Sequence, residues 1–149
     1  MILENKASDD TVKLLRECSS GAKMGVDTID GILKYVSNED LAEKLTKSKS
    51  IHTDIENETA MLLRERGETE KEPGVIAESM SCMKADLKLG MHETDNTVAD
   101  LITEGCNMGI KSLNRYLNQY TYADDNAKGI AKKLIETEEE LSHAVKEYL

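Results

Sequence analysis

The chain has 149 residues, a formal net charge of -10, no Phe or Trp and one proline. A chain of this length can bury a core as a single domain, here residues 1–149. Its acidic charge argues against nucleic acid and anionic membrane surfaces as partners, because both require a basic face. The absence of Phe and Trp, together with many Lys, Glu, Leu, Ala and Met residues, predicts an all-α fold.

The cysteines and the first residues bear on the compartment. Cys18, Cys82 and Cys106 are far apart and form no CxxC pair. An odd number of isolated thiols fits a reducing compartment better than a disulfide framework. The N-terminal MILENKASDD has no apolar run typical of a signal peptide, and no stretch approaches the ~18–20 apolar residues of a membrane span. We therefore expect a cytoplasmic protein.

The first long helix is predicted over about residues 9–36, after a lead-in at 1–8 and a cap at Ser8 or Asp9. A 3-4-3-4 spacing of apolar and small residues predicts one inward face, as in a bundle helix. The residues on this face are Val12, Leu15, Ser19, Ala22, Val26, Ile29, Leu33 and Val36. Glycines inside the helix favour close approach of a neighbouring helix; they are Gly21, Gly25 and Gly31.

The second long helix is predicted over residues 39–66. Ser37 can accept a hydrogen bond from the amide of Asp40 at its start, and Gly67 is a natural C-terminal cap. So short a turn makes the first two helices antiparallel neighbours. His52 lies halfway along the apolar face of this helix, which also carries Leu41, Leu45, Ile55 and Leu62.

A long connection separates the second and third long helices. It contains the one proline, Pro73, and a shorter predicted helix that ends at Gly90. Two more long helices follow, over residues 94–121 and, capped by Asp124, over residues 125–148. The connection is long enough to run the length of a bundle and make the second and third helices parallel. A simple up-down bundle with an extra docked helix is the alternative.

Two hairpins joined by a long crossover resemble the ferritin-like fold. More closely, the chain is similar to a family of uncharacterised bacterial ferritin-like four-helix-bundle proteins, a domain-of-unknown-function family. The similar stretches are LLRECSSGAKMG, MLLRERG, SMSCMKADLKLG and ITEGCNMGIKSLNRYL. The resemblance implies the fold and no established activity. In that family an acidic residue often follows the glycine of the third long helix, and here Cys106 stands in that place.

A ferritin-like fold raises the question of a di-iron centre. Such a centre takes a Glu from each of two helices and a Glu-x-x-His from each of the other two. Counting turns from the hairpin ends places His52 and Glu138 at the middle of the bundle, together with Ala22 and Gly105. Lys49 stands where the Glu of a Glu-x-x-His ending in His52 would be. The complete ligand set is therefore missing.

One Glu-x-x-His motif does occur, from Glu140 to His143, but it lies off the inward face of its helix. We interpret it as a solvated pair. His52 and Glu138 are better explained as a hydrogen-bonded pair that fixes the register of the bundle. We therefore expect no catalytic residue, no metal site and no cofactor.

The sequence favours a structural or interaction protein that self-associates or binds a protein partner. Tyrosines near the last turn are candidate contacts for self-association; they are Tyr116, Tyr120 and Tyr122. The alternative is an iron-binding ferritin-like protein or oxidase with a reduced metal site. Its ligands would be His52, Glu56, Glu104 and Glu138. A third hypothesis is a pocket between helices that holds a small apolar ligand.

Overall fold

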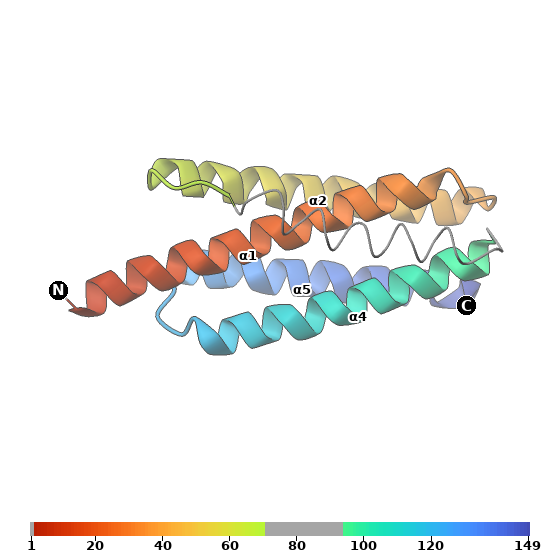
Figure 1. Ribbon diagram of the computed structural model, residues 1–149. Helices are drawn as coiled ribbons and strands as arrows, with labels where there is room; N and C mark the ends of the chain where they lie inside the picture. Colours follow the sequence, from red (N-terminus) through yellow and green to blue (C-terminus); the bar gives the residue numbers. More distant parts are fainter. Residues whose placement is uncertain (1, 71–93) are drawn as a thin grey trace.

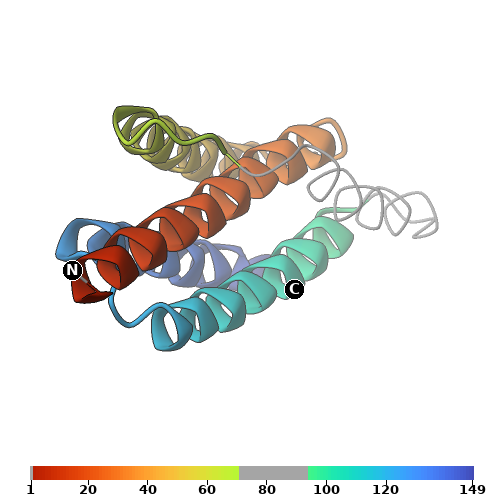
Figure 2. The ribbon, with the colours of Figure 1, turned by 60° about the vertical axis from the view of Figure 1, so that its left-hand side comes forward.

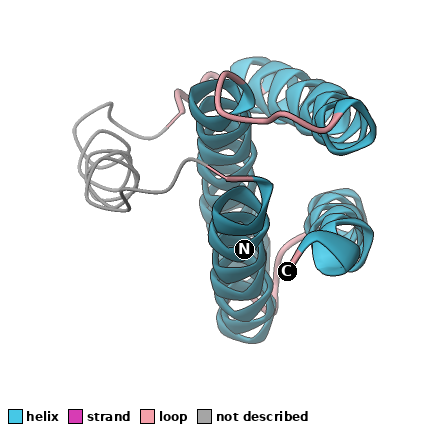
Figure 3. Cartoon of the chain, turned by 90° about the vertical axis from the view of Figure 1, so that its right-hand side faces the viewer, coloured by secondary structure: helices cyan, strands magenta, loops and turns pink. Residues whose placement is uncertain are grey.

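The computed structural model describes residues 2–70 and 94–149, which form four α-helices and a final 3-10 turn. The elements are α1 (Ile2–Leu33), α2 (Glu39–Glu65), α4 (Asp95–Gln119), α5 (Asp125–Val145) and η1 (Lys146–Tyr148). The four helices lie side by side as a bundle (Figure 1). No strand occurs in the described residues, as the colouring in Figure 3 shows, so the all-α prediction is confirmed. The shorter helix predicted between Pro73 and Gly90 lies outside the described residues.

Contacts between the helix ends define the directions of the helices. The amides of Ser37 and Asn38, at the start of α2, donate to the carboxylate of Asp95 at 2.8 and 3.1 Å. Because Asp95 begins α4, α2 and α4 start at the same end of the bundle and run in the same direction (Figure 1). The chain thus leaves α2 at one end and enters α4 at the other, as in bundles with one long crossover.

The apolar core consists of two clusters of buried residues. One contains Leu15 of α1 and Leu134 of α5, and the other contains Leu45 of α2 and Leu141 of α5. Polar residues near the middle of α2 and α5 fall between these clusters in the sequence. The bundle therefore has a polar layer between two apolar layers. None of the described helices is both long and apolar enough to cross a lipid bilayer.

The structure corrects the predicted start of α1. The helix begins at Ile2 instead of being capped at Ser8 or Asp9, so the predicted lead-in is helical. The stretch contains neither Pro nor Gly, and nothing in it stops a helix that is already nucleated by packing further along. The first turns of α1 consequently extend past the other helices (Figure 1), and Ile2 is 73% exposed.

The caps of α2 were predicted in part. The cap at its start is Asn38 instead of Ser37, and the side chain of Asn38 accepts a hydrogen bond from the amide of Leu41 at 3.0 Å. The predicted cap at Gly67 is confirmed by its positive φ of 71°. The amide of Glu68 donates to the carbonyl of Leu63 at 2.9 Å, which completes a Schellman motif.

The second hairpin begins as predicted. Thr94 and Asp124 are the N-caps of α4 and α5. The turn between these helices is held to α1, because the side chain of Asp10 accepts from the amide of Tyr122 and that of Thr11 from the amide of Asp124. Figure 2 shows this turn beside the N-terminal part of α1.

Candidate functional site

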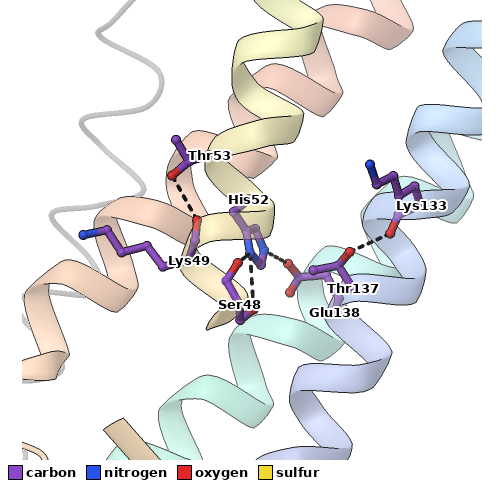
Figure 4. Close-up of polar contacts among 7 residues, drawn as sticks. All are labelled: Ser48, Lys49, His52, Thr53, Lys133, Thr137 and Glu138. Carbon is purple, nitrogen blue, oxygen red and sulfur yellow. Dashed lines mark hydrogen bonds and ion pairs between the residues drawn. The ribbon is translucent and has the colours of Figure 1, made fainter. Parts of the chain in front are cut away.

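The predicted pair of His52 and Glu138 is present in the polar layer. The imidazole of His52 is 1% exposed, and its Nε2 bonds to Oε1 of Glu138 across the contact between α2 and α5 (Figure 4). Its Nδ1 lies 2.8 Å from the carbonyl oxygen of Ser48, one turn earlier on α2. A carbonyl and a carboxylate both accept hydrogen bonds, so this geometry calls for a proton on each ring nitrogen.

The charge of His52 depends on a balance of opposing effects. Burial by itself lowers the pKa of His52, because it penalises the charged imidazolium. The hydrogen bond and negative charge of Glu138, together with the Ser48 carbonyl, act in the opposite direction, and the net pKa of His52 is raised. The side chain of Glu138 is 12% exposed. The two residues therefore form an ion pair in which each charge makes burial of the other less costly.

The other two helices close on this pair through small residues. A Cβ on Gly25 of α1 would lie 2.5 Å from Cδ2 of His52. On α4, a Cβ on Gly109 would lie 3.5 Å from Oε2 of Glu138. The thiol of Cys106, also on α4, is buried, and its pKa is raised by burial and then by the charge and hydrogen bond of Glu138. All four helices thus contribute to the surroundings of the pair.

The structure does not bring the other two proposed iron ligands to the pair. Glu104 is exposed on α4. Glu56 is half-buried, and its pKa is raised mainly by burial, while Lys23 of α1 opposes the shift. In residues 2–70 and 94–149, no group of three or more His, Cys, Asp or Glu side chains is placed to hold a metal ion. The donor set of a di-iron centre therefore does not fit these residues.

Two other groups from the sequence analysis lie at the surface or near it. Glu140 and His143 are both exposed, as expected for a solvated pair. Tyr116 and Tyr120 are half-buried and stack with ring centroids 6.2 Å apart. Tyr122 is 48% exposed, with Nζ of Lys6 5.5 Å from its ring centroid.

The sequence pattern does not distinguish the glycine that contacts the pair from the other glycines of α1. Gly25, Gly21 and Gly31 all lie within α1, and the pattern alone favoured close packing at each of them. In the structure the three differ: a Cβ on Gly25 would meet the ring of His52, a Cβ on Gly21 would lie 3.6 Å from Cδ2 of Leu134, and a Cβ on Gly31 would have no neighbour within 4 Å. One feature of the sequence could have indicated this contact. Gly25 lies inside a helix at about the level of the polar residue His52 on the next helix.

Comparisons with known proteins add information on the fold. No protein-family model matches the sequence, and no curated protein sequence matches it. The structure is similar to that of YcfI, "a putative structural protein from Rhodopseudomonas palustris", with a TM-score of 0.69 and 9% sequence identity. The similarity covers 89% of this chain and 87% of that chain. At this identity it shows a shared fold alone.

Proposed function

We propose that this chain is a structural or interaction protein, built as a ferritin-like bundle without a working di-metal centre. The proposal rests on the His52–Glu138 pair. Ser48 and Glu138 accept hydrogen bonds from the two ring nitrogens of His52. A histidine binds a metal through a nitrogen lone pair of the neutral ring. A doubly protonated His52 has no such lone pair.

Charge balance supports the same reading. In a di-iron protein the metal ions balance the charge of several carboxylates in the bundle core. Here the pair contains one carboxylate, Glu138, and the imidazolium of His52 balances it without a metal. The parallel course of α2 and α4 supports the ferritin-like topology. YcfI is described as "a putative structural protein", and we extend that description to this chain by its shared fold.

Metal content tests this proposal. Protein purified without chelator would be examined by elemental analysis and then titrated with Fe(II) under anaerobic conditions, with absorbance as the readout. We expect no stoichiometric metal and no iron-dependent absorbance. Stoichiometric iron that is lost in His52→Gln and retained in the exposed control His143→Gln would overturn the proposal in favour of the iron-binding alternative.

We further propose that the chain self-associates through the end of the bundle formed by the start of α1 and the α4–α5 turn. Ile2 and Leu3 are 73% and 64% exposed, and Tyr122 lies beside the same turns of α1 because Lys6 contacts its ring. Apolar side chains here are mixed with charges of both signs, such as Lys6 and Asp9. Such a surface can pair with a second copy of itself around a twofold axis.

Light scattering over a range of protein concentrations tests the self-association. We expect a dimer in the wild-type protein and weaker dimerisation when Ile2 and Leu3 are both replaced by Ser. Met108→Ser is the matched control, because Met108 is also an exposed apolar residue, at 71%, but lies on α4. A wild-type protein that stays monomeric at every concentration would contradict the proposal.

A cytoplasmic location remains part of the proposal. Cys18 and Cys106 are both buried free thiols. Burial, with a smaller effect from Glu17, raises the pKa of Cys18 to about 12, so its reactive thiolate form is scarce at neutral pH. Free thiols in a core are in keeping with a reducing compartment. Fractionation of the source cells with an antibody to the chain would test this location.

A further inference from the structure

The contact between the two hairpins contains both surface and buried charges. Near the ends of α2, Lys44 pairs with Glu147 and Arg66 pairs with Asp124, and all four side chains are at least 30% exposed. At the middle of α2, His52 bonds to Glu138 from within the core. The surface pairs are screened by water and contribute little to stability, whereas the buried pair is sensitive to the charge of each partner.

The buried contact depends on a proton. A neutral imidazole has one N–H group, but His52 has acceptors at both nitrogens, the Ser48 carbonyl and the Glu138 carboxylate. After loss of a proton, one of these acceptors would face a nitrogen lone pair. Glu138 would also lose the charge that balances its carboxylate. Loss of this proton therefore weakens the contact between α2 and α5 at the polar layer.

The groups on the neighbouring helices do not change charge in the pH range in which His52 loses its proton. On α4, Cys106 contacts Glu138, and burial and this contact raise the pKa of its thiol, so that it stays neutral. On α1, Gly25 faces the ring and has no side chain. On α2 itself, Ser48 supplies a carbonyl oxygen and a hydroxyl group 3.4 Å from Nδ1. Neither group titrates.

We propose that the His52–Glu138 pair is a proton-dependent clamp between the α1–α2 and α4–α5 hairpins. With His52 protonated, α2 and α5 are held together at the polar layer. When His52 loses its proton, this layer opens locally and exposes Cys106. The apolar clusters on both sides of the layer keep the helices folded in both states. This inference goes beyond the proposed structural role, because it assigns a control of that structure by pH.

Two thiols of the chain can report this opening. Cys106 lies at the polar layer, whereas Cys18 is buried in the apolar cluster that contains Leu15 and Leu134. The full chain would be alkylated with iodoacetamide at a series of pH values, and peptide mass spectrometry would give the rate at each thiol. Both thiolate fractions rise about tenfold per pH unit below their pKa values. The ratio of the Cys106 rate to the Cys18 rate therefore rises only if Cys106 becomes more exposed, because loss of the positive charge beside Glu138 would by itself raise the pKa of Cys106 and lower the ratio.

We expect this ratio to rise between a pH of about 6.5 and the raised pKa of His52, and to level off above that pKa. NMR titration of the imidazole would measure the pKa of His52 independently. The rise should be about tenfold for each pH unit by which that pKa exceeds the ordinary value of about 6.5. His52→Gln removes the titrating group and should give a constant ratio, while the exposed control His143→Gln should keep the rise. A wild-type ratio that stays constant from about pH 6.5 to the measured pKa would overturn the proposal. The same rise in His52→Gln would overturn it too. The wild-type measurement decides by itself if the His52 variant does not fold.

Discussion

The imidazole of His52 lies directly against the backbone of Gly25. A Cβ at position 25 would be 2.5 Å from Cδ2 of this ring and 2.8 Å from its Nε2, which is closer than a Cβ atom approaches a non-bonded neighbour. The ring has no room to move away, because Ser48 and Glu138 hold its two nitrogens. Glycine normally weakens a helix interior. Here it allows a histidine to be buried between α1 and α2.

We predict that Gly25→Ala destabilises the protein by about 1–3 kcal/mol, as overpacking of a core typically does. The new methyl group must displace the His52 ring or push α1 and α2 apart. This loss exceeds the ~0.5–1 kcal/mol that alanine gains over glycine in a helix. Urea unfolding followed by circular dichroism would measure the change.

Gly31→Ala is the matched control for this prediction. Gly31 lies in the same helix, and a Cβ there would have no neighbour within 4 Å. We expect this variant to be as stable as the wild type or up to about 1 kcal/mol more stable. If Gly25→Ala is stabilised to the same extent, the ring of His52 does not occupy the space beside Gly25.

A second prediction concerns the coupling between His52 and Glu138. His52→Leu leaves the carboxylate of Glu138 without a counter-charge, and Glu138→Leu leaves the imidazole without its acceptor. Removing one partner of a fully buried pair costs about 3–5 kcal/mol, and the partial exposure of Glu138 lowers our expectation to about 2–4 kcal/mol. The double variant should be no less stable than either single variant, because it leaves no unpaired charge.

A double-mutant cycle based on urea unfolding would measure this coupling. Glu140 and His143 are exposed residues of α5, the helix that carries Glu138, and they provide the control cycle. Each of their substitutions should change the free energy of unfolding by no more than about 0.5 kcal/mol. Additive losses for His52 and Glu138 would show that the two side chains act independently and would contradict the ion pair.

The level of this pair was predictable from the sequence because helix geometry is regular. A fixed rise per residue sets the height of each position above the turn of its own hairpin, so equal counts from the two opposite turns meet at the middle of the bundle. Counting turns therefore brought His52 and Glu138 together. The same count could not show that Gly25 faces the ring, since that depends on the rotation of α1 about its axis and on its distance from α2. Neither quantity follows from a periodic pattern.

A third prediction concerns the dependence of stability on pH. Since the pKa of His52 is raised in the folded protein, its contribution to stability is fully present below the unfolded pKa of about 6.5. It is lost as the pH rises through the folded pKa. We expect the difference in unfolding free energy between wild type and His52→Gln to shrink over this range.

Urea unfolding of both proteins at several pH values would test this, because other titrating groups are common to the two and cancel in the difference. The expected slope follows the protons bound in the folded and unfolded states. A difference that grows with pH would mean that His52 is buried in its neutral form, with a lowered pKa. This experiment reports global unfolding, whereas thiol alkylation reports local opening of the polar layer.

The helix ends were less predictable than the helix centres. Several neighbouring residues near a turn have side chains that can cap a helix, and local sequence gives similar support to each. In this structure a residue from another helix also contacts this turn, because the carboxylate of Asp95 accepts hydrogen bonds from the amides of Ser37 and Asn38. The side chain of Asn38 is then the one that reaches the amide of Leu41. Such a contact between helices is absent from a local pattern.

The fourth prediction distinguishes these two caps. Asn38→Ala removes the acceptor for the amide of Leu41 and should cost about 1 kcal/mol, the usual effect of losing an N-cap side chain. Ser37→Ala should change stability by less than about 0.5 kcal/mol, because Ser37 contacts Asp95 through its backbone amide, which alanine retains. Urea unfolding of the two variants under identical conditions would compare them. A larger loss for Ser37→Ala than for Asn38→Ala would favour the predicted cap at Ser37 and would mean that the α1–α2 turn is shifted by one residue.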